Sequence, residues 1–151
     1  NEPPSEPPTE PGRKTERLAL RVVPLPRDTN QYETVFGGVI LSWLDQAGFI
    51  EARRHGKHRW VTVSIDRVDF HAPVHVGDTV SFYARTVRTG RSSVKVHIRV
   101  EAERYLSHDT VLVTEADMTM VSVDAAGRAI PFTSPATVTT ELPSCRHASA
   151  A

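Results

Sequence analysis

Hydrophobic residues recur along this chain with two different periods, and the change of period separates one helix from a set of strands. From Gly38 to about Arg54 apolar residues return every three or four positions, which is typical of a helix with one buried face; they are Ile40, Trp43, Leu44, Ala47 and Ile50. Gly56 is well suited to end that helix. In residues 94–103, "VKVHIRVEAE", apolar and polar residues alternate instead. That alternation predicts a strand with one dry face and one solvated face.

Further segments also have the composition of strands. Residues 18–25, "LALRVVPL", precede the helix and end at prolines, and after the helix come "RWVTVSIDRVDF", "DTVSFYARTV" and "TVLVTEADMTMVSV". Short turns, two of them containing Gly77 and Gly90, connect these segments. One strand, one long helix and then four strands predict an α+β fold. The simplest burial of both apolar faces wraps an antiparallel sheet around the helix.

Length and charge narrow the class of protein. The 151 residues suffice for one domain with a substantial core. Lysine plus arginine and aspartate plus glutamate number 18 each, without a long basic block, so we expect neither a nucleic acid nor a membrane surface as partner. No apolar run approaches the ~20 residues of a membrane span. We therefore expect a cytoplasmic protein, although a removed targeting segment stays open.

The two ends of the chain differ in composition from its middle. Residues 1–15 contain five prolines and several glutamates with almost nothing apolar, which predicts a flexible tail. Residues 134–151 are also weak in core-forming side chains and are expected to hang off the domain or to lie along its surface. The domain is accordingly placed at residues 16–133. The single cysteine, Cys145, excludes an internal disulfide framework.

Asp45 and the glycine pair at the helix start are the first candidates for chemistry. A carboxylate inside an apolar stretch must be paired, be protonated or face a polar pocket. Gly37 and Gly38 lie where backbone N–H groups lack partners and the helix dipole is positive; they either bind a carbonyl oxygen or simply permit a tight turn. Eight residues of helix rise separate Gly37 from Asp45 by roughly 12 Å. A carbonyl bound to those amides is thus out of reach of Asp45 on the same helix. An antiparallel helix of a second subunit could supply the carboxylate instead.

Other polar groups are less specific. Asp28, Thr29 and Asn30 either form a turn or project a side chain into a site. Residues 89–95, "TGRSSVK", combine groups that hold phosphate, but hairpin chemistry explains their glycine equally well. The seven histidines form no helical pair backed by a third ligand, and no serine stands in a nucleophile elbow. With no metal site expected, carboxylate chemistry remains.

Three motifs taken together, "DTN…FGG…LDQAG", "VTVSIDRVDFHAPVHVGD" and "GRSSVKVHIRVEAE", closely resemble the hotdog-fold acyl-CoA thioesterases of the YciA and cytosolic acyl-CoA hydrolase type. The resemblance covers about residues 17–131. It implies a hotdog fold, obligate homodimers with two sites at the interface, commonly assembled as trimers of dimers, and hydrolysis of acyl-CoA without a metal or redox cofactor. Coenzyme A enters as part of substrate and product.

The resemblance also implies roles for particular residues. Asp45 corresponds to the catalytic carboxylate, acting either as general base or as nucleophile, and Asn30 to the asparagine that holds the carbonyl or water. Gly37 and Gly38 resemble the amides that polarise the thioester. The family's coenzyme A contacts correspond to a strand segment and a turn, which here consist of Thr62, Val63, Ser64, Gly90, Arg91, Ser92 and Ser93.

One position departs from the family pattern. The family usually has a glycine three residues after the asparagine, where this chain has Glu33. If that glycine takes a positive φ, either glutamate strains the loop by about 1 kcal/mol or more, or the loop has another shape. The rival functions are a hotdog dehydratase acting on hydroxyacyl thioesters, which would place a histidine near this loop, and a non-catalytic acyl-CoA-binding module.

Overall fold

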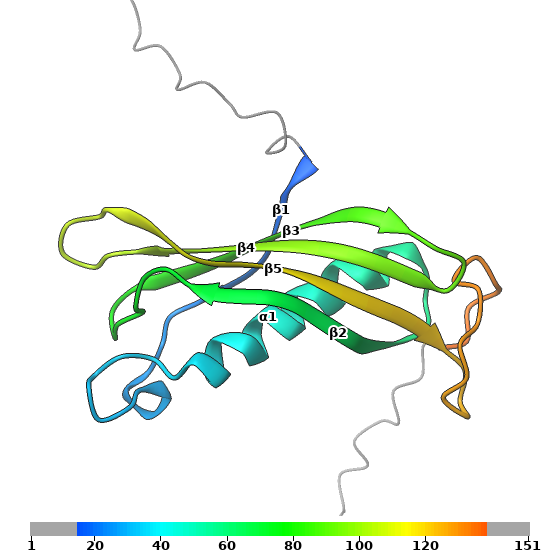
Figure 1. Ribbon diagram of the computed structural model, residues 1–151, viewed down its shortest axis with the longest axis horizontal. Helices are drawn as coiled ribbons and strands as arrows, with labels where there is room; N and C mark the ends of the chain where they lie inside the picture. Colours follow the sequence, from blue (N-terminus) through cyan, green and yellow to red (C-terminus); the bar gives the residue numbers. More distant parts are fainter. Residues whose placement is uncertain (1–14, 139–151) are drawn as a thin grey trace, which may run out of the picture.

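The computed structural model describes residues 15–138, which form five antiparallel strands and one long helix, with two short 3-10 turns. The strands are β1 (Arg17–Val22), β2 (Arg59–Phe70), β3 (Thr79–Thr89), β4 (Ser93–Glu103) and β5 (Thr110–Val123), and the helix is α1 (Gly37–Ala52). The 3-10 turns are η2 (Pro26–Asp28) and η3 (Arg53–His55). The sheet order is β1-β3-β4-β5-β2, and the sheet curves around α1 (Figure 1). The predicted α+β architecture and element order are confirmed.

The core lies between α1 and the concave face of the sheet. In β4 the predicted alternation holds throughout: Val94, Val96, Ile98, Val100 and Ala102 are fully buried, while the residues between them are partly exposed. The helix packs so closely on the sheet that a Cβ on Gly48 would lie 2.5 Å from Met118 Sδ. A larger residue there would require the Met118 side chain to move.

The buried face of α1 differs in part from the predicted face. Ile40, Leu44 and Ala47 are buried as expected, but Trp43 and Ile50 are only partly buried. Gly48, Glu51 and Ala52 complete the buried face instead. The closest approach at Gly48 decides this orientation, which period alone does not reveal.

Glu51 is a buried acid that the pattern of the sequence did not single out. Its side chain is 2% exposed, and Oε1 accepts hydrogen bonds from Arg17 Nη2 and Thr86 Oγ1, both at 3.0 Å. The ion pair and the hydroxyl satisfy the carboxylate that burial would otherwise leave unpaired. The contacts attach β1 and β3 to the end of α1.

The helix ends near the predicted residue for a different reason. α1 stops at Ala52, η3 follows, and Gly56 is extended with φ 169° rather than left-handed. A Cβ on Gly56 would lie 2.7 Å from the Phe132 carbonyl oxygen. The glycine thus permits close packing of the segment after β5, not a helix cap.

Beyond residue 133 the described chain still contacts the domain. The N–H groups of Thr137 and Val138 lie 3.1 and 3.2 Å from the Lys57 carbonyl oxygen. The expected tails at 1–14 and 139–151 lie outside the described residues. Within residues 15–138, no helix has the length and apolar character that crossing a membrane requires.

Candidate active site

Asp45 lies on the side of α1 that faces β2, the strand at one edge of the sheet. Its side chain is half-buried, and Oδ1 accepts a short hydrogen bond from the Thr62 hydroxyl. The Thr62 oxygen also lies 3.2 Å from Met120 Sδ. Sequence analysis predicted both residues as site residues on separate grounds, and the fold brings them together. The acid is therefore paired at the border of the core rather than buried within it.

A bulge in β2 shapes the strand next to Asp45. The pairing with β5 steps from Thr62 opposite Met120 to Ser64 opposite Thr119, which leaves Val63 as the extra residue. The Val63 side chain is 62% exposed, and Ser64 is partly buried. The three residues predicted to border the substrate arm thus form an irregular, accessible stretch on the edge strand.

Gly37 and Gly38 begin α1 with free backbone donors. The residue before them, Phe36, provides no side-chain cap, and in residues 15–138 no acceptor contacts either glycine N–H. A Cβ on Gly38 would meet nothing within 4 Å, and one on Gly37 would make ordinary contact with the Phe70 ring at 3.5 Å. Neither residue has a positive φ. Packing and backbone geometry therefore do not require glycine at these two positions. A ligand that approaches the backbone amides would require it, because glycine has no Cβ.

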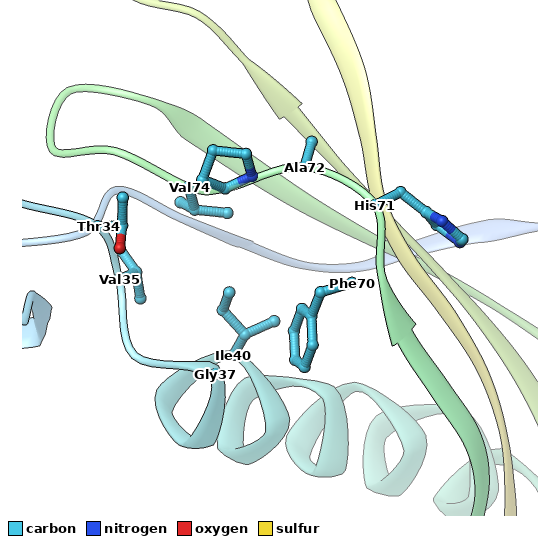
Figure 2. A pocket seen from close by; sticks show the side chains of 9 residues that line it. Thr34, Val35, Gly37, Ile40, Phe70, His71, Ala72 and Val74 are labelled. Atoms are coloured by element: carbon cyan, nitrogen blue, oxygen red, sulfur yellow. The ribbon is translucent and has the colours of Figure 1, made fainter. Parts of the chain in front are cut away.

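A cavity of about 340 Å³ opens beside the start of the helix. Figure 2 shows Thr34 and Val35 on one side, Gly37 and Ile40 below, and the segment 70–74 above. The Val35 N–H donates to the Val74 carbonyl at 2.8 Å, which fixes the loop against that segment. The lining is largely apolar. It can receive a hydrocarbon group close to two exposed amide donors.

Phe70 and His71 are lining residues that sequence analysis did not assign to the site. Phe70 ends β2 and is 46% exposed, and His71 directly follows it. His71 was considered only as a metal ligand. Their signal was the aromatic residue at the end of a strand just before Pro73, but only the fold shows that this strand end meets the start of α1.

Asn30 shapes its own loop. Its Oδ1 accepts from the N–H of Tyr32 at 2.9 Å and from that of Thr34 at 3.2 Å, and its Nδ2 donates to Thr34 Oγ1 at 3.0 Å. One Nδ2 hydrogen is left without an acceptor among the described residues. The predicted contact of Asn30 with a carbonyl or water stays a prediction, and a structural role is evident.

Glu33 takes the conformation that the family glycine suggested. Its φ is 62°, in the left-handed region, and its N–H donates to the Asn30 carbonyl at 3.1 Å. The side chain is exposed. The loop has kept a shape suited to glycine, with a glutamate in the strained position.

The turn between β3 and β4 lies at the other end of the molecule. The Gly90 N–H donates to the Ser93 carbonyl at 2.8 Å, and the Ser92 carbonyl accepts from the Ser122 N–H at 2.9 Å. The Arg91 side chain is exposed and has no partner within the described part of the chain. This predicted nucleotide turn is well separated from the start of α1 (Figure 1).

The candidate residues therefore form three groups in one chain. Asp45 contacts Thr62 on β2. Gly37 lines the apolar cavity, with Gly38 next to it in sequence and Asn30 bonded to the lining residue Thr34. The turn from Gly90 to Ser93 lies at the far end of the molecule (Figure 1). The rise from Gly37 to Asp45, eight residues along α1, is about 12 Å. Among residues 15–138, no three His, Cys, Asp or Glu side chains are grouped as ligands of a metal ion.

Residues 32–105 match the sequence model of one protein family, the Thioesterase superfamily. It is 39% identical to the acyl-CoA thioester hydrolase YciA of Escherichia coli over 119 residues, covering 76% of this chain and 90% of that protein. The chain belongs to the thioesterase superfamily. An uncharacterized acyl-CoA thioester hydrolase of Zymomonas mobilis is 44% identical over 108 residues, covering 70% of this chain and 71% of that protein.

Solved structures of thioesterases have the same fold. A hexameric thioesterase from Yersinia pestis superimposes with a TM-score of 0.74 at 40% identity, covering 78% of this chain and 96% of that one. A hexameric hotdog-fold thioesterase of Campylobacter jejuni gives 0.73 at 40% identity, covering 77% and 90%. The predicted hotdog fold and family are confirmed.

Proposed function

We propose that this thioesterase hydrolyses acyl-CoA to a free acid and coenzyme A, with Asp45 as its catalytic carboxylate. The carrying observation is that Thr62, on the edge strand β2, hydrogen-bonds to Asp45 at the border of the core, where the half-buried carboxylate remains accessible to a ligand. Family membership and relatives named acyl-CoA thioester hydrolases support the substrate class.

The start of α1 binds the thioester carbonyl. Its oxygen accepts from the N–H groups of Gly37 and Gly38, and the positive end of the helix dipole stabilises the oxyanion as it forms. The acyl chain enters the apolar cavity beside Phe70. These amides are fixed before substrate arrives, so little reorganisation accompanies the reaction.

Asp45 activates the attack on the carbonyl carbon. As a general base it removes a proton from water while the water oxygen bonds to the carbonyl carbon. The C–S bond then breaks, and the proton held by Asp45 passes to the departing thiolate to give free coenzyme A. As a nucleophile it would instead form a mixed anhydride that water then opens. In both routes Thr62 orients the carboxylate, and the remaining Asn30 N–H is available to the carbonyl or water.

The complete site lies between two copies of the chain. β2 is a 12-residue edge strand, paired with β5 alone within the described residues, and it exposes Val61 and Val63. Long apolar edge strands are usually covered in folded proteins. A two-fold partner docked on β2 would bring its own helix start toward Asp45, which the helix rise separates from its own chain's glycines.

Each dimer then contains two equivalent sites. The relatives from Yersinia pestis and Campylobacter jejuni are described as hexameric, which supports a trimer of dimers for this chain as well. The proposed dimer is the minimal active unit, and the hexamer joins three such units.

Thiol release from a panel of acyl-CoA substrates tests the function. Asp45→Asn should keep the fold and bind coenzyme A but lower kcat by at least ~100-fold, the scale of a lost general base. Gln46→Ala, at the exposed neighbouring position, serves as the matched control. Normal turnover by a folded Asp45→Asn protein would remove Asp45 from the mechanism. A wild type that binds acyl-CoA without releasing thiol would instead be a non-catalytic module.

A further inference from the structure

Two methionines of β5 lie in the core beneath α1, and one of them contacts the pair formed by Thr62 and Asp45. Met118 and Met120 are both fully buried, and because they are two residues apart on the strand they face the same side of the sheet. Met118 packs beside Gly48, whereas Met120 Sδ lies 3.2 Å from the Thr62 hydroxyl oxygen. No step of the proposed reaction yet uses this sulfur.

The Thr62 hydroxyl has one hydrogen and lies between two acceptors. One is the half-buried Asp45 carboxylate, and the other is the buried thioether of Met120. Within residues 15–138, no further acceptor lies within hydrogen-bond distance of this hydroxyl. A thioether sulfur is a weak acceptor, and an ionised carboxylate is a strong one. As long as Asp45 is ionised, Thr62 therefore donates to the carboxylate and leaves the sulfur without a hydrogen bond.

This balance changes once Asp45 has taken a proton from water. A neutral carboxyl group is itself a donor, and it is a weaker acceptor than a carboxylate. The Thr62 oxygen can accept from the Asp45 O–H only when its own hydrogen points to another acceptor. Met120 Sδ lies where that hydrogen can turn by rotation about the Thr62 Cβ–Oγ1 bond, without movement of heavy atoms.

Other charged groups do not replace this contact. Within residues 15–138, Asp45 has no ion pair and no hydrogen-bond partner other than Thr62. On the same helix, Glu51 contacts Arg17 of β1 at 3.0 Å. β2 and β5 carry acids on the outer face of the sheet, and His97 of β4 binds one of them at 2.8 Å; these acids are Asp66, Glu115 and Asp117.

We propose that Met120 is a positioning residue for hydrolysis, an inference that rests on the proposed function. Its sulfur accepts the Thr62 hydrogen while Asp45 carries the proton taken from water, and the Thr62 oxygen accepts from the Asp45 O–H. When that proton passes to the departing thiolate, the hydroxyl turns back to the carboxylate. No covalent bond to sulfur forms or breaks. Met120 thereby stabilises the protonated state that a general base must reach.

Two conservative variants test this role. Met120→Leu removes the sulfur at nearly constant volume, and Met118→Leu does the same at a position without a hydroxyl neighbour. Met120→Leu should lower kcat about threefold with KM unchanged, and should move the acidic limb of the pH–kcat profile about half a unit to lower pH, because the protonated acid loses a hydrogen bond. Met118→Leu should match wild type. An unchanged acidic limb in Met120→Leu would overturn the inference.

A double-mutant cycle distinguishes hydrogen bonding from packing. In a Thr62→Val background the sulfur has no hydroxyl to accept from, so adding Met120→Leu should change neither kcat nor the pH profile. A further threefold loss in the double variant would mean that Met120 acts through core packing, and the proposed role would be wrong.

Carbon-13 NMR of the aspartate carboxyl groups measures the protonation of Asp45 without turnover. The Asp45 signal, assigned by its loss in Asp45→Asn, should titrate about half a unit lower in Met120→Leu than in wild type. That difference would support the role of the sulfur even if wild type hydrolysed no acyl-CoA. Equal titration in the two proteins would reject it while leaving the proposed hydrolysis intact.

Discussion

Thr62 and Asp45 form the residue contact on which the proposed chemistry depends. The threonine hydroxyl donates to the carboxylate from the edge strand, next to the bulge at Val63. A carboxylate held by one charge-assisted hydrogen bond keeps its other oxygen free for water or substrate. Thr62 is therefore a positioning residue in addition to its predicted place along the substrate arm.

Two replacements of Thr62 distinguish the effect of its hydroxyl group from the effect of its side-chain shape. Thr62→Val should lower kcat about tenfold, the scale of one charge-assisted hydrogen bond, and Thr62→Ser should keep most of the activity. Steady-state kinetics and coenzyme A affinity measure the two effects. Equal kcat for the valine and serine variants would show that the hydroxyl does not position the acid.

Glu33 stores local strain in the loop before α1. A non-glycine residue in the left-handed region costs on the order of 1–3 kcal/mol. Within residues 15–138 its exposed side chain forms no hydrogen bond or ion pair that would offset this. Asn30 and Thr34, which hydrogen-bond to each other across the loop, maintain the conformation instead.

Glu33→Gly should raise the free energy of unfolding by up to about 1 kcal/mol, because strain relief exceeds the extra chain entropy of glycine. Gln31→Gly, in the same loop without a positive φ, should lower it by a few tenths to about 1 kcal/mol. Urea denaturation measures both. Similar destabilisation by the two variants would mean that residue 33 is not strained.

At the scale of elements, α1 has a different task at each end. Its start presents two amides without a side chain over them, its middle carries Asp45 toward β2, and the chain directly after it, in η3, is basic at Arg53 and Arg54. In the proposed mechanism the helix is thus the axis that spaces the carbonyl-binding amides from the acid. Burial of Leu44 and Ala47 against the sheet holds that axis in place.

Gly38→Ala tests whether the start of α1 binds the carbonyl. An added methyl meets nothing within 4 Å, so the protein should stay as stable as wild type. The methyl would nevertheless stand where the substrate approaches, and kcat/KM should fall at least ~10-fold, below the ~100-fold scale of a lost oxyanion donor. Thermal unfolding controls for the fold. Unchanged kinetics would leave the glycine as a residue of helix geometry alone.

At the scale of the whole molecule, one chain contains every proposed group but separates them. The amides of Gly37 and Gly38 and the Asp45 carboxylate are spaced by the rise of the same helix. Among residues 15–138, the outer edge of β2 pairs with no strand. A proposed two-fold assembly would resolve both features with one contact, since each partner would bring its helix start toward the Asp45 of the other.

Subunit mixing tests this assembly. Gly38→Ala and Asp45→Asn proteins are each impaired, and a mixed dimer would hold one site with both defects and one with neither. Random reassociation makes half the dimers mixed, so roughly a quarter of wild-type activity should return. Gly38 is preferred to Asn30 because Asn30→Ala would also disturb the loop that its side chain shapes. Proven exchange without recovery would place both groups in one chain.

The sequence by itself determined the elements and the family. The alternation in β4 and the helical period of α1 follow directly from which side chains must leave water, so their bounds were predicted to within a few residues. For residue 33 the sequence left a strained loop and a different loop open, and the positive φ of Glu33 shows the strained one. The motifs identified the thioesterase family before any contact was known.

Only the tertiary structure decided which side chains meet. Thr62 contacting both Asp45 and Met120, and Phe70 and His71 closing the cavity at the helix start, all join segments far apart in the chain. Such pairings depend on how closely α1 packs at Gly48 and on where β2 bulges. Those features depend on how whole helices and strands pack against one another. The hydrophobic period and the local conformational propensities of the sequence do not specify that packing.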